Sequence, residues 1–212
     1  ILGNSPLPPS TGITNFKGNT ADINGKGVDV ELIFNIINSK NFQWNSTWLF
    51  SHNTNRITRY KVNTSTLGFR EGYSYDALFS YPWAGLDPQT GDPQGYLYKN
   101  VSKAWSTIIN NDSLENLIFH GSSMPTYFGS LRNGISWNKF NLSFNLIYKF
   151  GFFFRRTSVD YISIHNGLLG FTHRDFHNRW QKPGDENLTH VPSMIYPLNN
   201  SSRQTFYSNS EI

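Results

Sequence analysis

The chain of 212 residues is rich in aromatic residues (16%), poor in charged residues (15%) and carries a formal net charge of +4. Its positive charges are scattered, which excludes the concentrated basic face that nucleic-acid binding requires, so no nucleic-acid partner is expected. The absence of cysteine excludes disulfide bonds and cysteine-based metal sites. No apolar run reaches about 18 residues, so no membrane-spanning helix is predicted. Abundant aromatic, Asn and Ser residues favour a β-protein with long polar loops.

The first predicted element is a hairpin at about residues 27–52, in which apolar side chains recur at every second position. One face of its first strand comprises Val28, Val30, Leu32, Phe34 and Ile36, and the other comprises Asp29, Glu31, Ile33, Asn35 and Ile37. Its second strand carries Phe42, Trp44, Ser46, Trp48 and Phe50 on one face and Gln43, Asn45, Thr47, Leu49 and Ser51 on the other. A break at 38–41 predicts a tight turn. Each strand has roughly ten residues, the length that crosses a membrane at a tilt.

The second predicted element is a long loop at about residues 53–124, which is rich in Gly, Pro, Asn and Ser. Within this loop, residues 101–110 are a candidate for a short helix, although β-branched residues weaken the pattern. The loop also contains the aromatic residues Tyr73 and Trp83, whose rings are candidates for ligand contact.

A second hairpin, at about residues 127–154, shows the clearest alternation in the chain. The dipeptide Asn138-Lys139 predicts a two-residue turn at its tip. The strand after the turn carries Phe140, Leu142, Phe144, Leu146, Tyr148 and Phe150 on one face and Asn141, Ser143, Asn145, Ile147 and Lys149 on the other. A second long polar loop, at about residues 155–212, follows this hairpin.

The connections alternate between short turns and long loops, which is the plan of an outer-membrane β-barrel. Aromatic residues beside the short turns, Phe42, Trp44, Trp137 and Phe140, suit the girdle at the periplasmic interface. The long segments are therefore expected to be extracellular loops. In such a barrel, Asp29, Glu31, Asn35, Asn45, Asn141, Asn145 and Lys149 would face the lumen, and Val30, Leu32, Phe34, Trp48, Leu142, Phe144 and Leu146 would face lipid.

A soluble β-sandwich also has strands with one apolar face. Its strands are typically about five or six residues long, however, and the strands predicted here are longer. Strand length and the unequal connections favour an all-β chain that forms part of a transmembrane antiparallel barrel. A soluble carbohydrate-binding or adhesin β-domain stays open as the alternative.

About four strands of membrane length are too few to form a barrel alone, because the smallest membrane barrels use about eight. An open sheet in lipid leaves backbone groups unpaired, and each costs several kcal/mol. We therefore expect the remaining strands to come from further sequence or from a second chain.

Five segments resemble, in the same order, motifs of the SusC/RagA family of TonB-dependent outer-membrane transporters. They are residues 24–32, 42–57, 71–93, 125–133 and 177–192. The closest match is Gly85-Leu86-Asp87-Pro88-Gln89-Thr90-Gly91-Asp92-Pro93. The fourth segment has Ser130 where the family usually has glycine.

This resemblance implies a large barrel of the 22-stranded type with an N-terminal plug, to which the chain would contribute part of the C-terminal half. A plug domain is absent from the sequence, so the plug and the remaining barrel are expected to belong to another segment or chain. The implied function is import of oligosaccharides or peptides across the bacterial outer membrane. The implied partners are a SusD-like surface lipoprotein and, through the missing N-terminal part, TonB; no cofactor is implied.

Candidate substrate-binding residues lie in the first long loop: Tyr73, Trp83, Asp87 and Asp92. Aromatic rings can stack on sugar rings, and the two carboxylates can contact a ligand or a cation. The alternative is structural, because Asp-Pro and Thr-Gly-Asp-Pro sequences form turns in which Asp caps its own backbone and Gly supplies positive φ. The aromatic side chains can equally pack the loop onto itself.

No enzymatic activity is predicted for this chain. It has no Gly-x-Ser-x-Gly elbow and no phosphate-binding glycine-rich loop before a helix. His173 and His177 have the spacing that on a helix lets two imidazoles bind one metal ion, but no helical pattern surrounds them. We therefore expect neither catalytic residues nor a metal site.

Overall fold

The computed structural model describes residues 2–6, 15–19, 21–60, 69–111, 116–167, 173–195 and 200–210. Its strands are β1 (Leu2–Pro6), β2 (Asn15–Asn19), β3 (Ala21–Asn38), β4 (Phe42–Tyr60), β5 (Ala77–Ser80), β6 (Trp83–Leu86), β7 (Pro93–Leu97), β8 (Asn100–Ser102), β9 (Ile118–Ser122), β10 (Tyr127–Trp137) and β11 (Phe140–Phe150). Its helices are α1 (Trp105–Ile109), α2 (Tyr161–His165), η3 (Arg174–Asn178), η4 (Asp185–Asn187) and α3 (Ser201–Ser208). Most of the described elements are thus strands, as predicted.

The chain forms two compact units. The first contains the described residues up to Tyr60 together with Phe69–Leu78 and Gly121–Phe153. The second contains Phe79–His120 and the described residues from Phe154 onwards. Each unit is therefore built from parts of the chain that are separated in sequence.

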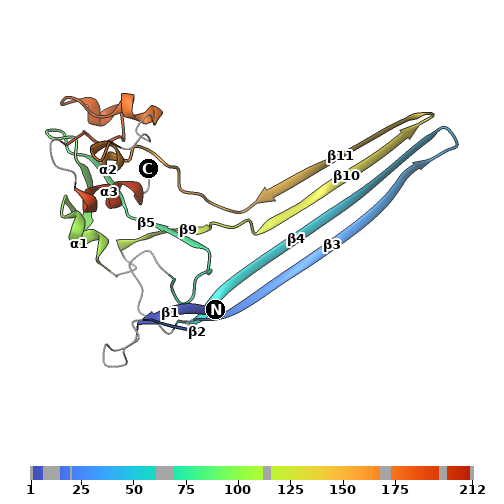
Figure 1. The fold of residues 1–212 in the computed structure, drawn as a ribbon, viewed down its shortest axis with the longest axis horizontal. Helices are drawn as coiled ribbons and strands as arrows, with labels where there is room; N and C mark the ends of the chain where they lie inside the picture. The colour runs from blue at the N-terminus through green and yellow to red at the C-terminus, as the bar shows by residue number, and fades with distance from the viewer. Residues whose placement is uncertain are drawn as a thin grey trace. The chain divides into compact units, whose positions relative to one another are not determined.

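The main feature of the first unit is a four-stranded antiparallel sheet in the order β11-β10-β4-β3 (Figure 1). The two predicted hairpins lie side by side in it, because β10 pairs with β4 along its whole length. Their turns are at the same end, where the backbone N–H of Asn138 donates to the carbonyl of Asn41 at 2.9 Å. Asn138 has φ 51°, as a two-residue hairpin turn requires. Among the described residues, no sheet closes on itself.

The register of this sheet gathers the apolar side chains on one face. Residues paired across antiparallel strands share a face. Leu131 of β10 pairs with Trp48 and with Leu146, and Ile135 pairs with Trp44 and with Leu142. Most polar residues alternate with these positions and lie on the opposite face, whereas Ser46 and Asn133 pair with each other on the apolar face. The two faces predicted from alternation are accordingly continuous across the sheet.

One prediction about these faces was wrong. The alternation places Ile36 with Phe34 and places Ile37 on the polar face. In the structure Asn35 pairs with Asn45 but Ile37 pairs with Trp44, so a bulge occurs at residue 36. Because a bulge adds one unpaired residue, it shifts the alternation, and Ile37 joins the apolar face.

Both strands of the first hairpin continue beyond the predicted bounds of 27–52, since β3 begins at Ala21 and β4 ends at Tyr60. Beyond Tyr127, where β10 begins, the segment after Phe69 becomes the neighbour of β4. The carbonyl of Tyr73 accepts from the N–H of Ile57 at 2.8 Å, and the carbonyl of Ile57 accepts from Gly72 at 2.9 Å. The part of the first predicted loop next to the sheet is therefore an ordered extension of it.

The second unit has a small core where helices α1 and α3 meet the sheet β6-β7-β8. Phe206 of α3 is fully buried there beside Tyr81 and Ile108. Gly95 of β7 lies under Phe206, and a side chain at this position would overlap the ring. The short helix expected at 101–110 is present but begins only at Trp105, because β8 occupies residues 100–102.

Two further pairs of strands are small: β1 pairs with β2, and β5 pairs with β9. A second buried cluster in the second unit comprises Val159, Tyr161 and Val191. Among the described residues, no helix is both long and apolar enough to cross a membrane.

Candidate functional site

The apolar face of the four-stranded sheet is exposed rather than packed against another layer. Phe140 is 76% exposed, and Leu142, Leu146 and Phe150 are also more than half exposed. A water-soluble domain rarely leaves so large an apolar surface uncovered, and such surfaces mark contact with a membrane or another protein. This face is therefore the first candidate for a functional surface.

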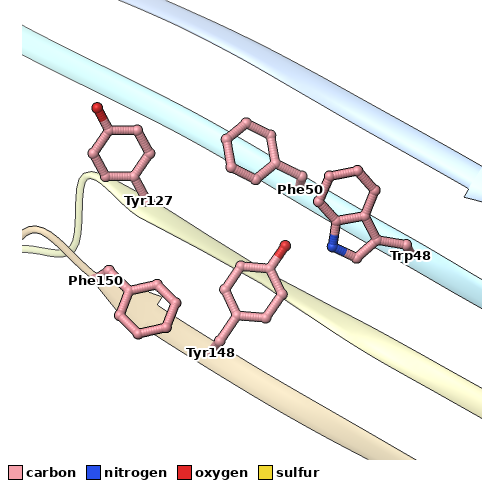
Figure 2. A pocket seen from close by; sticks show the side chains of 5 residues that line it. All are labelled: Trp48, Phe50, Tyr127, Tyr148 and Phe150. Atoms are coloured by element: carbon pink, nitrogen blue, oxygen red, sulfur yellow. The ribbon is translucent and has the colours of Figure 1, made fainter.

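Aromatic side chains gather where this face ends, at the end remote from the hairpin turns. They line a shallow hollow of about 460 Å³ and stand on the same side of the sheet (Figure 2): Trp48 and Phe50 from β4, Tyr127 from β10, and Tyr148 and Phe150 from β11. The ring of His52 stacks on Tyr127 at 4.2 Å between centroids. Tyr and Trp combine an apolar ring with a polar atom, which suits a boundary between hydrocarbon and water. We call these five hollow-lining residues the aromatic row.

The aromatic row depends on a glycine in the middle of the sheet. Gly129 is paired with Tyr148 on one side and Phe50 on the other. The Tyr148 ring lies over Gly129, and its hydroxyl donates to the carbonyl oxygen of Leu49 at 2.7 Å. A Cβ at position 129 would overlap both that oxygen and the Tyr148 phenol. Tyr148 therefore connects three strands, and only glycine leaves room for it.

Two polar residues interrupt the apolar face near its centre, and both are covered. Ser46 and Asn133 are paired with each other and are each 5% exposed. The indole N–H of Trp44 donates to Asn133 Oδ1 at 3.1 Å. Because a buried carbonyl oxygen is costly only when it has no donor, this bond lets an amide sit within an apolar surface.

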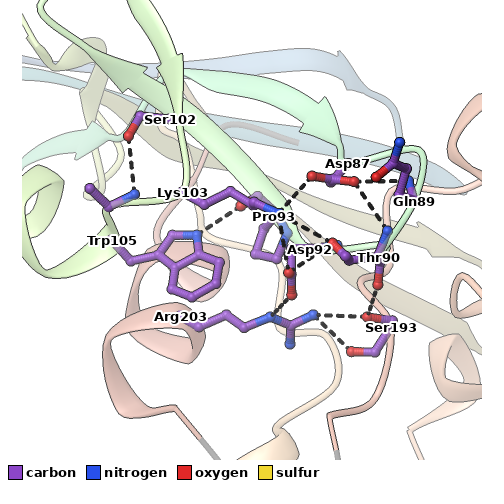
Figure 3. Close-up of polar contacts among 11 residues, drawn as sticks. Asp87, Gln89, Thr90, Asp92, Pro93, Ser102, Lys103, Trp105, Ser193 and Arg203 are labelled. Carbon is purple, nitrogen blue, oxygen red and sulfur yellow. Dashed lines mark hydrogen bonds and ion pairs between the residues drawn. The ribbon is translucent and has the colours of Figure 1, made fainter.

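The predicted ligand residues Asp87 and Asp92 lie in the second unit, in a turn between β6 and β7 (Figure 3). Asp87 Oδ1 accepts from the backbone N–H groups of Gln89 and Thr90, and its Oδ2 accepts from Lys103 Nζ at 2.7 Å. The hydrogen bond from Lys103, followed by the one from Gln89, lowers the pKa of Asp87 to about 2. The same contact raises the pKa of Lys103.

Asp92 accepts hydrogen bonds from a different set of donors. Its Oδ1 accepts from Arg203 Nε at 2.9 Å and its Oδ2 from the hydroxyl of Thr90 at 2.8 Å. Arg203 is buried, which lowers its pKa, and its guanidinium also donates hydrogen bonds to the carbonyl and hydroxyl of Ser193. Ser193 in turn donates to the carbonyl of Thr90 at 2.7 Å. Both carboxylates are thus bonded to donors of this chain (Figure 3).

The two motif segments of the second unit meet at this turn. Gly91, with φ 67°, lies against the ring of Trp180, and a side chain at position 91 would overlap that ring. The carbonyl of Gly91 also accepts from the N–H of Ser193 at 2.9 Å. The two segments that resemble family motifs, 84–93 and 177–192, are therefore packed against each other in this unit.

The other two predicted ligand residues lie apart from these carboxylates. Trp83 is partly buried and stacks on Phe206, with 6.3 Å between ring centroids. Within the described part of the chain, its buried indole N–H has no hydrogen-bond partner. Tyr73 belongs to the first unit, where its backbone carbonyl extends the pairing of β4. The structure therefore brings together Asp87 and Asp92, and it packs Trp83 in the core of the same unit.

Sequence reasoning did not identify the cations of this cluster. Lys103 is 16 positions from Asp87 and Arg203 is 111 positions from Asp92. A further ion pair, Arg156 with Asp175 at 2.8 Å, was also missed. No local pattern indicates which cation meets which carboxylate, because the choice depends on packing between distant segments. Among the described residues, no cluster of three or more His, Cys, Asp or Glu side chains could hold a metal ion.

A sheet with one apolar and one polar face, and with short turns at one end, has the pattern of an outer-membrane barrel wall. No protein-family model matches the chain. Among curated proteins it is similar to the TonB-dependent receptor P39 of Formosa agariphila, with 23% identity over 252 residues, covering 95% of this chain and 24% of the receptor. The chain thus spans about a quarter of that relative's length.

Solved structures with a similar fold are named as peptide transporters or importers. The RagAB peptide transporter matches with a TM-score of 0.61 and 20% identity, over 93% of this chain and 22% of that chain. The RagAB peptide importer in its closed-closed state matches with a TM-score of 0.60 and 19% identity, over 92% and 22% of the two chains. These matches confirm the resemblance to TonB-dependent transporters of the RagA type. The proteins named are receptors and transporters, not enzymes.

Proposed function

We propose that this chain forms part of the wall of a TonB-dependent transporter that imports nutrients across the bacterial outer membrane. The four-stranded sheet crosses the bilayer, with its apolar face toward lipid and its polar face toward the lumen. The second unit belongs to the loops on the extracellular side. Further strands complete a barrel of the 22-stranded type.

The observation that carries this proposal is the height of the apolar face. It extends from the Trp137–Phe140 pair beside the turn to the Tyr127–Phe150 pair in the aromatic row. The 11 residues of β10 span these rows, which corresponds to about 34 Å along the strand. Barrel strands tilt by about 40°, so the face is about 26 Å high, close to the apolar band of about 25 Å on outer-membrane barrels.

The edges of the sheet support a larger assembly. In the part of the chain that the structure describes, β3 and β11 each pair with a strand on one side only. An unpaired edge in hydrocarbon costs several kcal/mol per backbone group, so both edges require neighbouring strands. These strands come from the rest of the transporter. That part of the protein also contains the plug and the segment that contacts TonB.

The comparisons support the choice of cargo and partner. The structural neighbours are named as a peptide transporter and a peptide importer, so peptides are the first substrate class to test and oligosaccharides the second. The two-part name RagAB fits the proposal that a second protein, a SusD-like surface lipoprotein, accompanies the transporter. The curated relative is named as TonB-dependent, which supports TonB as the energy source.

Cysteine labelling tests the membrane orientation directly, because the chain has no cysteine of its own. Single substitutions Leu146→Cys and Asn145→Cys place thiols on the two faces at adjacent positions. In outer-membrane vesicles, a water-soluble maleimide should label Asn145→Cys and should react with Leu146→Cys only after detergent is added. Equal labelling of both thiols without detergent would favour the soluble β-domain instead.

Uptake measurements test the transport function. A strain that lacks the full-length protein should lose import of its cargo, either labelled peptides or oligosaccharides. Expression of the protein from a plasmid should restore import, but only in a strain with functional TonB. Within the first unit, Tyr73→Ala tests the proposed substrate contact, because it removes a ring while leaving the backbone bond to Ile57 in place. Reduced uptake at unchanged protein levels is expected. Normal uptake would remove Tyr73 from the candidates.

A further inference from the structure

The apolar face of β3 and β4 becomes polar and positively charged beyond the aromatic row. Val28, His52 and Tyr127 are paired across three neighbouring strands and mark the end of the aromatic row. The next pair on this face is Lys26 with Thr54, and the one after is Asn24 with Arg56. The register is regular between these pairs, since its irregularities lie at 22/23 and 35/37. Two cations therefore follow directly on the edge of the apolar surface.

Neither of these two cations has an acidic residue directly opposite it on the sheet. The residues directly opposite them, Thr54 and Asn24, are neutral. Within the described residues, neither Lys26 nor Arg56 takes part in an ion pair, and both are exposed. Further along the same face Arg59 is opposite Asp22, so its charge has an acidic neighbour. Asp22 is also a diagonal neighbour of Arg56, so the rows beyond the aromatic residues hold the three cations Lys26, Arg56 and Arg59 against one carboxylate.

The positions of Lys26 and Arg56 fit a single anionic group. Diagonal neighbours in an antiparallel pair are about 7–8 Å apart. The Arg56 guanidinium lies beside Gly72 in the structure, and rotation of this exposed side chain toward Lys26 would let both cations reach one phosphate. With the strand tilt of a barrel, they lie about 5 Å and about 10 Å above the aromatic row. The headgroup layer of a bilayer begins at the aromatic row and is about 5–7 Å deep. The backbone of Lys26 lies within this layer, and the long Arg56 side chain can extend back into it. Lysine and arginine side chains also extend along apolar surface while keeping the charge in water.

We propose that Lys26 and Arg56 form a binding site for the phosphate of a net anionic lipid headgroup in the leaflet next to the aromatic row. The proposal rests on the membrane orientation given above. The aromatic row marks the boundary between the hydrocarbon core and the headgroup layer. The two cations lie on the headgroup side of this boundary. Phosphate is favoured because it accepts charge-assisted hydrogen bonds from both an ammonium and a guanidinium group.

Lipid binding to the full-length transporter, purified in detergent, tests this site. Native mass spectrometry would give the affinity for phosphatidylglycerol, with zwitterionic phosphatidylcholine as the comparison lipid. The double substitution Lys26→Gln with Arg56→Gln should weaken phosphatidylglycerol binding by about fivefold per cation and leave phosphatidylcholine unchanged. The charge-conserving pair Lys26→Arg with Arg56→Lys should bind as the parent does, which shows that loss of binding does not come from misfolding.

Matched controls use cations elsewhere on the same sheet. Arg132→Gln with Lys149→Gln removes two charges from the polar face, and Arg59→Gln removes the charge opposite Asp22. Neither should change phosphatidylglycerol affinity. The proposal is overturned if the Lys26/Arg56 double variant binds the lipid as tightly as the parent, if the controls lose as much, or if millimolar inorganic phosphate displaces the lipid.

The outcome can be separated from that of the proposed function. If cysteine labelling places Leu146 in lipid while the double variant keeps its affinity, this inference alone fails. If labelling places Leu146 in water, the membrane orientation fails and the lipid site fails with it.

Discussion

Asp92 and Arg203 form the most buried ion pair described in the second unit, with side chains 15% and 5% exposed. Replacing Asp92 by Ala should destabilise this unit by about 3 kcal/mol, because the guanidinium is left buried without its anion. Hydrogen exchange of the backbone around residues 87–103 would report the loss.

A double variant distinguishes pairing from packing at this site. Asp92→Leu with Arg203→Met replaces both charges by apolar groups, so it should recover much of the protection lost in Asp92→Ala. If backbone hydrogen exchange is faster in the double variant than in Asp92→Ala, the two residues do not stabilise the unit by neutralising each other's charge.

Asp87 makes the stability of the second unit sensitive to acid. Its pKa is lowered to about 2 by Lys103 and the turn N–H groups, while the unfolded carboxyl titrates near 3.8. A lowered pKa in the folded state contributes stability above pH 3.8, and this contribution is lost as the pH falls toward 2. Monitoring local unfolding between pH 5 and about pH 2 should show this loss in the parent. Lys103→Met should make the acid dependence shallower, and an unchanged profile would argue against the assigned cause.

His173 and His177 show why spacing alone is a weak guide at this scale. His173 caps a short 3-10 helix that contains His177, and positions four apart do not share a face on such a helix as they do on an α-helix. His173 Nδ1 accepts from the backbone N–H of Asp175 instead. Turn formation by Asp87 was among the alternatives weighed from sequence, because it uses only neighbouring residues. The partner of Asp92 was not predictable, because it comes from the other end of the chain.

At the scale of elements, Gly129 is the most constrained position in the sheet. Gly129→Ala should cost about 1–3 kcal/mol, because the new methyl group displaces Tyr148 or separates the strands. Gly25→Ala is the matched control, since the nearest atom to a Cβ there is a carbonyl oxygen at 3.8 Å. Thermal unfolding of the reconstituted transporter should show a clear decrease for the first variant and little change for the second. Equal effects would contradict the role given to Tyr148.

Alternation predicted the faces of β4 and β11 correctly because period 2 is a direct consequence of the pleat. It failed at Ile36 and Ile37, where two adjacent apolar residues fit either face and only the partner strand reveals the bulge. The ends of β3 and β4 were also missed. There the polar side chains of Asn53 and Asn55 resemble loop residues, although the backbone continues in the sheet.

At the scale of the whole molecule, the lipid-facing orientation predicts unequal effects of charge on the two faces. Phe144→Arg should destabilise the barrel by about 2–4 kcal/mol, since Phe144 lies near the middle of the apolar band. Asn145→Arg introduces the same side chain at the next position but on the polar face, and it should have a much smaller effect. Urea unfolding in lipid bilayers gives both values. Equal destabilisation would mean that the faces are not in different solvents.

The split second unit has a consequence for biosynthesis. One part of it, from Phe79 to His120, precedes β10 and β11 in the chain, and the part that contains α3 follows them. During synthesis from the N-terminus, Tyr81 and Ile108 are made long before Phe206 arrives to complete their core. The core of this unit therefore stays incomplete until β10, β11 and α3 have been made. A ribosome that stops before Ser201 would release a chain in which Asp92 has no guanidinium to meet, and proteases should find that chain far easier to cut.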